Sequence, residues 1–234
     1  KLLKTLTCFA SVFAIGSTIA ITSTSCGSSS EEKIYALPED VYQIDANGVL
    51  QGFKSGVDLS QYDDGKCDTL LIPTSVTSIK DFAFVNTYAT ATTIPQFITK
   101  LIFPKKSNCS SISGWAFGKC SSLTFVDLLN CSKITTIDDN AFSSCSLLPS
   151  ITFPSSLETI GNSAFWNCSS LKYIAWDLPD EYETKIKVDN AAFSQISSTG
   201  TVKSLNLSIA SSQQLFDWIK TKGSFPSAGW GPAD

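Results

Sequence analysis

The sequence contains no histidine, no arginine and no methionine. Without histidine, a Ser-His-Asp or Cys-His nucleophile, a histidine-ligated zinc site and imidazole acid–base catalysis near neutral pH are all excluded. Without arginine, the chain lacks the bidentate guanidinium that recognises phosphate and guanine. The side chains that most enzymes use are therefore largely missing.

Charged residues are also few. They make up 16% of the 234 residues, and 17 lysines against 21 acidic residues give a formal net charge of −4. Proteins that bind nucleic acid usually carry a basic surface, so we expect no nucleic-acid partner. A hydrophobic content of 43% is typical of a folded domain. The composition favours a binding or structural protein that has no cofactor, no metal and no catalytic residue.

Residues 1–25 contain the one extended apolar stretch, and Ser and Thr interrupt it. It is too short and too polar for a membrane-spanning helix of about 20 apolar residues. Small residues lead directly to Cys26, and a Ser-rich segment follows it. This pattern resembles a bacterial lipoprotein signal, although Ser23 stands where Leu is usual. The resemblance implies that Cys26 carries the lipid, that residues 26–40 form a flexible tether and that the protein is held on the extracellular face of the cell membrane. The alternative is an ordinary secretory signal in which Cys26 has no role.

The rest of the chain repeats one pattern. The dipeptide Ala-Phe occurs five times, at spacings of 33, 25, 23 and 28 residues. An aliphatic residue stands four positions before each Ala, and in three copies a Cys stands three positions after the Phe. The five pairs are Ala83-Phe84, Ala116-Phe117, Ala141-Phe142, Ala164-Phe165 and Ala192-Phe193.

The clearest copy covers residues 148–168, and its aliphatic, Pro, Ala-Phe and Cys positions recur together in the neighbouring copies. This unit resembles the BspA-like leucine-rich repeat, which reads roughly L-x-x-I-x-L-P-x-x-L-x-x-I-x-x-x-A-F-x-x-C-x-x. The match covers residues 67–196. The resemblance implies a leucine-rich-repeat solenoid in a bacterial surface protein.

The residues indicate the same architecture. Alternating runs such as Ile151-Thr152-Phe153 predict short parallel strands on one face of a β-rich α/β repeat. We expect the Ala-Phe segments to form short helical or 3-10 turns on the other face. One coil cannot bury its apolar side alone, but stacked coils share a continuous core. The expected array of five repeats spans residues 67–200.

Both ends of the array need a cap. Residues 41–66 form the expected N-terminal cap, with a hairpin around Asn47-Gly48. Residues 201–234 form the expected C-terminal cap. In it we predict a last strand, a helix that begins with a capping box at Ser211, and an irregular tail.

Six cysteines follow the signal segment, and an even number in an exported protein ordinarily suggests disulfides. Cys120, Cys145 and Cys168 share one inward position with Ile196, which favours small buried hydrophobic residues instead. Disulfides between stacked coils remain the alternative. A metal site here is disfavoured, because thiols in an apolar core lack supporting polar partners.

The outward positions of the strands give the candidate binding site. Leu71, Ile102, Phe125 and Tyr173 occupy such positions, and we expect them to form an exposed apolar patch. The alternative is that caps or the longer loops near residues 88–96 and 179–183 cover them. Solenoids commonly bind partners on this face.

The sequence thus predicts a surface protein that binds another protein, and the family resemblance implies adhesion to host or matrix components. A structural or antigenic surface lipoprotein without a dedicated ligand is the first alternative. An enzyme is the second alternative. The one catalytic motif in its favour, the S-x-x-K of Ser169 to Lys172, arises easily by chance in a Ser-rich chain.

Overall fold

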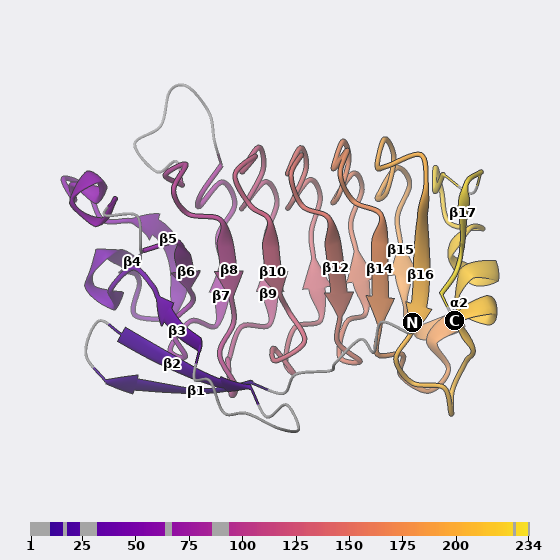
Figure 1. Ribbon diagram of the computed structural model, residues 1–234, viewed down its shortest axis with the longest axis horizontal. Coiled ribbons are helices and arrows are strands. Elements are labelled where there is room, and N and C mark those ends of the chain that lie inside the picture. Colours follow the sequence, from indigo (N-terminus) through magenta and orange to yellow (C-terminus); the bar gives the residue numbers. More distant parts are fainter. Residues whose placement is uncertain are drawn as a thin grey trace.

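The chain winds into stacked coils, and each coil contributes one strand to a front sheet and one to a back sheet (Figure 1). The computed structural model describes residues 10–15, 18–23, 32–63, 67–85, 94–226 and 228–233. The front strands are β6 (Thr69–Leu71), β8 (Lys100–Ile102), β10 (Phe125–Asp127), β12 (Ser150–Phe153), β14 (Tyr173–Trp176) and β16 (Gly200–Ser204). The back strands are β7 (Ser78–Ile79), β9 (Ser111–Ile112), β11 (Thr136–Ile137), β13 (Thr159–Ile160) and β15 (Lys187–Val188). The predicted solenoid is confirmed, and β16 continues the front strands beyond residue 200.

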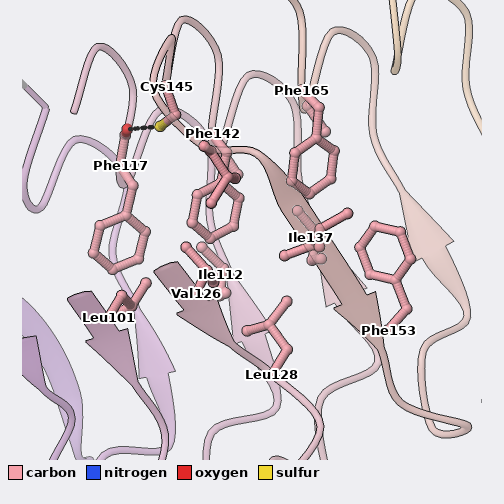
Figure 2. Close-up of a cluster of buried hydrophobic side chains, with 14 of the residues drawn as sticks. Leu101, Ile112, Phe117, Val126, Leu128, Ile137, Phe142, Cys145, Phe153 and Phe165 are labelled. Atoms are coloured by element: carbon pink, nitrogen blue, oxygen red, sulfur yellow. Dashed lines mark hydrogen bonds between the residues drawn. The ribbon is translucent and has the colours of Figure 1, made fainter. Parts of the chain in front are cut away.

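Aliphatic side chains fill the space between the two sheets (Figure 2). In the front strands β6 to β14 the second residue points inward, as Leu101 and Val126 do. In the back strands the second residue also does so, as in Ile112 and Ile137. Within each group of paired front strands the pairing is parallel and without a shift, so Leu101 lies beside Val126. Equivalent residues of the repeat therefore stack on one another along the whole core.

The phenylalanines of the Ala-Phe pairs form a continuous column through the array. Neighbouring rings are nearly parallel, with centroids 5.4, 5.3, 5.4 and 5.5 Å apart from Phe84 to Phe193. This spacing is within the range of favourable aromatic pairs. Phe53 closes the column edge-on at one end, and Phe225 does so at the other. The two caps thus bury the outermost rings.

The Ala-Phe segments form turns that are neither α-helical nor 3-10 helical. The prediction of a short helical or 3-10 conformation is therefore wrong for them. The residue before each Ala has a left-handed backbone, with φ of 57° at Trp115 and Asn140. A second left-handed residue follows two positions after the Phe, as at Lys119 and Ser144. These residues interrupt any helix and turn alternate N–H groups toward the next coil, where the Phe117 N–H donates to the Ala141 carbonyl at 2.8 Å.

The cysteines after the Ala-Phe pairs are buried and make a second ladder. The thiol of Cys145 donates to the carbonyl of Phe117 on the preceding coil at 3.3 Å (Figure 2). Cys120 and Cys168 donate in the same way to Phe84 and Phe142, at 3.2 and 3.1 Å. A thiol suits this position because it is small, apolar and still a weak donor. The prediction of buried cysteines in this column is confirmed.

The front strands form two sheets, β10-β8-β6 and β12-β14-β16-β17, with a break between β10 and β12. In the coils before and after the break, the residue preceding the strand donates its N–H to the coil before it. Thr124 donates to Thr99 at 2.8 Å, and Lys172 donates to Pro149 at 3.0 Å. Pro149 holds this position before β12 and has no N–H to donate. The break follows from that missing donor.

The N-terminal cap contains the predicted hairpin, formed by β4 (Tyr42–Ile44) and β5 (Val49–Phe53). β5 also pairs in parallel with β7 and so joins the back sheet. Two 3-10 helices flank the hairpin, η1 (Glu39–Val41) and η2 (Leu59–Tyr62). Upstream, β1 (Ala10–Ile15), β2 (Thr18–Ser23) and β3 (Glu32–Tyr35) form a small antiparallel sheet.

The C-terminal cap contains α2 (Ser212–Ile219), and Ser211 and Gln214 make the predicted capping box. The expected irregular tail is instead partly a strand, β17 (Trp230–Pro232), which pairs in parallel with β16. Trp230 anchors it by donating its indole N–H to the Ser197 carbonyl at 2.8 Å. A short helix that the sequence did not indicate, α1 (Tyr182–Lys185), lies in the longer loop after β14.

The phenylalanine column generates a stability prediction. Phe142→Ala or Phe165→Ala removes a fully buried ring between two stacked neighbours and should lower the free energy of unfolding by about 3–5 kcal/mol. Thr152→Ala, on the outward side of β12, is the control and should change it little. Equal and small effects at all three positions in urea denaturation would contradict the assigned core.

The cysteine ladder generates a pH prediction. Burial raises the pKa of the Cys168 thiol to about 12 from its ordinary value of 9.0. Because the folded state keeps the proton, this thiol stabilises the fold fully below pH 9 and loses that contribution as the pH rises toward 12. The free energy of unfolding of the reduced chain should therefore fall with pH in this window. Cys168→Ala should reduce the slope by about 1.4 kcal/mol per pH unit. Identical slopes for variant and parent would contradict the assignment.

Candidate functional site

The outward side of the front strands carries the predicted binding residues. Phe125 and Tyr173 are the first residues of β10 and β14, and Ser150 on β12 lies between them in register with Tyr173. The Phe125 side chain is 46% exposed, which is high for a large apolar residue on a strand. Tyr173 is half-buried, and its burial raises the pKa of its phenol. We call the outward residues of β10, β12 and β14 the sheet face.

Leu71 and Ile102 do not belong to an exposed patch, contrary to the prediction. They are only 7% and 5% exposed, although they lie outside the main core cluster. They are register partners on β6 and β8 and so lie against each other. The segment after β3 adds to the free side of β6, where Ala36 bridges Thr69 and is itself buried. The outward side chains of Leu71 and Ile102 are therefore buried, whereas Phe125 on the next strand is exposed.

The charged groups near Phe125 are already engaged. Its register partner Lys100 pairs with Asp68, with 2.9 Å between the ammonium and a carboxylate oxygen. Asp127, two residues along β10, accepts hydrogen bonds from the Leu129 N–H and the Asn130 side-chain amide, at 3.0 and 2.9 Å. Burial raises the pKa of the Asp127 carboxyl despite these donors. The centre of the sheet face is thus an aromatic surface bordered by satisfied polar groups.

Two exposed leucines on the same coils were not anticipated. Leu129 follows β10, and Leu147, which is 54% exposed, precedes β12. The signal for Leu129 was present in the sequence, since it stands where Pro104 and Pro154 close other strands. Both leucines adjoin the coils on either side of the break between β10 and β12.

The second of the two longer loops packs against the C-terminal cap. Residues 86–93 of the first loop, including Tyr88, lie outside the described residues. In the second loop Tyr182 is buried and packs edge-on against Trp218 of α2, with ring centroids 5.3 Å apart. This loop therefore supports the C-terminal cap.

No catalytic arrangement is evident among the residues that the structure describes. Within them, no group of three or more His, Cys, Asp or Glu side chains is placed to hold a metal ion. Ser169 and Lys172 are both exposed on the turn before β14. Leucine-rich-repeat solenoids are typically not enzymes. Cys26, the predicted lipid-bearing residue, lies outside the described residues. Among the described helices, none has the length and apolar character that a membrane span needs.

The stacked parallel strands, the shared core and the repeated Ala-Phe turns define a leucine-rich-repeat solenoid. The family model of the BspA type leucine-rich repeat region matches residues 98–212 in six copies. This part of the chain belongs to the BspA-type leucine-rich repeat family, as its sequence indicated. No curated protein matches the chain.

The chain is similar to several solved structures. The pneumococcal vaccine antigen PcpA superposes with a TM-score of 0.50 at 14% identity, over 83% of this chain and 48% of that one. A leucine-rich repeat protein from Bacteroides ovatus gives a TM-score of 0.46 at 21% identity, over 72% of this chain and 43% of that one. A leucine rich cell surface protein from Faecalibacterium prausnitzii gives 0.43 at 19% identity, over 82% and 54%. The chain thus spans about half the length of these proteins.

Proposed function

We propose that this protein is a lipid-anchored surface protein that binds a host or extracellular-matrix protein through its sheet face. The observation that carries the proposal is the exposed Phe125 ring on the outward side of the front strands. Large aromatic residues that remain exposed on a rigid surface are typical of protein–protein contacts.

The surroundings of Phe125 support this role. Tyr173 lies two strands away on the same side, and the small residues Ser150 and Thr152 separate the two aromatic side chains. Interface energy concentrates in a few aromatic anchors near the centre of a patch. Because Lys100 and Asp127 are already engaged within the protein, a partner does not have to displace water from unpaired charges at this spot.

The rigidity of the array also supports a binding role for the sheet face. The strands on either side of Tyr173 are fixed by parallel ladders, from Ser150 through Tyr173 to Thr201. Side chains held on such strands lose little conformational entropy when a partner binds. A preformed surface of this kind suits an extended segment or a flat face of a folded protein.

The sheet face generates a binding prediction. Phe125→Lys combined with Tyr173→Lys should abolish binding of the full chain to immobilised matrix proteins and to host-cell surfaces. Both side chains lie outside the core, so circular dichroism and the melting temperature should change little. Binding is measured by surface plasmon resonance and by cell attachment.

The matched control adds the same two charges to the back sheet. Thr136→Lys combined with Thr159→Lys alters outward residues of β11 and β13 and should leave binding intact. A sheet-face double variant that binds as well as its parent would contradict the assigned surface. If the parent binds none of these probes, the structural or antigenic alternative is favoured instead.

The lipid anchor generates a separate prediction. Cys26→Ala should block lipid attachment, because the thiol is the acceptor that the resemblance implies. The expressed variant should leave the detergent-rich phase after phase separation with a non-ionic detergent. Cys8→Ala is the control and should partition like the parent. Unchanged partition of Cys26→Ala would contradict the anchor without bearing on the sheet face.

A further inference from the structure

Two buried cysteines depart from the position that the other cysteines share. Cys109 lies three residues before Ile112, and Cys131 lies six residues before Ile137 on the next coil. Both are completely buried. They therefore reach the core from different positions of the repeat.

This offset matters for disulfide geometry. Cys120, Cys145 and Cys168 occupy equivalent positions, and each directs its thiol at the carbonyl of a Phe on the preceding coil. Side chains that point the same way cannot easily reach the dihedral angle near 90° that a disulfide needs. Cys109 and Cys131 are free of this constraint because their positions on the two coils differ.

The two residues are also in direct contact. The Cys131 Sγ lies 3.2 Å from the Cys109 carbonyl oxygen. The thiols affect each other's titration as well. The neighbouring Cys131 thiol, followed by burial, raises the pKa of Cys109, while the Cys109 thiol, followed by the Ser107 hydroxyl, lowers the pKa of Cys131. The short contact between the Cys131 Sγ and the Cys109 carbonyl oxygen places the two residues next to each other on neighbouring coils.

We propose that Cys109 and Cys131 form a disulfide when the chain folds in the presence of a low-molecular-weight disulfide such as oxidised glutathione. The Cys131 thiolate attacks one sulfur of that disulfide, which forms a mixed disulfide and releases one glutathione thiolate. The Cys109 thiolate then attacks the Cys131 sulfur and releases the second glutathione thiolate. The protein loses two electrons and two protons, and the two glutathione thiols carry them.

The cross-link would join the coils of β9 and β11, on the side of β10 away from the break. The loop that it closes joins residues 22 apart. A disulfide over such a loop stabilises the fold by restricting the unfolded chain. Cys131 follows β10, the strand at which the sheet β10-β8-β6 ends. The bond would hold this terminal strand where the backbone ladder to β12 is missing.

Peptide mapping tests the bond directly. The full chain is refolded in a glutathione redox buffer at pH 8, alkylated, and cleaved with trypsin and a protease that cuts before Asp. Residues 107–119 should be recovered joined to residues 127–133, two peptides that contain Cys109 and Cys131 as their only cysteines. Recovery of both cysteines as alkylated thiols, or in bonds to other cysteines, would overturn the proposal.

A stability comparison tests the consequence. The urea midpoint of the oxidised parent should exceed that of the reduced parent, and Cys145→Ala, the matched control in the parallel column, should keep this difference. Cys131→Ala should lose it. If that variant fails to fold, the conservative variant Cys131→Ser takes its place. A difference that persists in Cys131→Ser would overturn the assignment of the bond to this pair.

Discussion

The stack of phenylalanine rings from Phe84 to Phe193 is the interaction on which the array depends. Each ring is fully or almost fully buried and touches the ring of the coil before it and the ring of the coil after it. A single coil would expose its ring on both sides. Stacking buries these faces, and only the two end rings need the caps that Phe53 and Phe225 supply.

The ring stack fixes the distance between coils, and the backbone and thiol ladders fix their register. Alternate N–H groups of the Ala-Phe turns point to the next coil because left-handed residues interrupt the turn, and the buried thiols satisfy Phe carbonyls of the preceding coil. Left-handed backbone is unfavourable at residues such as Trp115, and the repeated inter-coil hydrogen bonds offset that cost. The backbone ladder between the front strands is interrupted before β12, where Pro149 has no N–H to donate. At this point the front strands divide into two sheets.

This division and the exposed apolar residues occur in the same part of the molecule. Phe125 begins β10, Leu129 follows it, and Leu147 precedes β12. The proposed Cys109–Cys131 bond would hold the coil that ends at this break. The centre of the array thus combines the break in the front strands with three exposed apolar side chains, Phe125, Leu129 and Leu147.

Much of the fold was predictable because the copies of a repeat can be aligned with one another within a single sequence. The recurrence of Ala-Phe placed the core column, Asn47-Gly48 placed the hairpin, and Ser211 with Gln214 placed the C-terminal helix. The turn conformation was not predictable, because left-handed residues at Trp115 or Asn140 follow from hydrogen bonds to another coil. Of the four predicted sheet-face residues, Phe125 and Tyr173 lie on the open part of the sheet, and Leu71 and Ile102 do not.

The sequence alone determined the phase of the coils, since the spacing of apolar residues decides which side chains point inward. It predicted five repeats, whereas the front strands β6 to β16 form six coils and the family model matches six copies. Tertiary structure alone decided which outward residues stay exposed. Leu71 and Phe125 occupy outward positions of equivalent strands, yet one is covered and the other is half-exposed. Leu71 lies against Ile102 on β8, whereas Phe125 lies on the strand at which its sheet ends, and exposure of this kind is set by neighbours distant in the sequence.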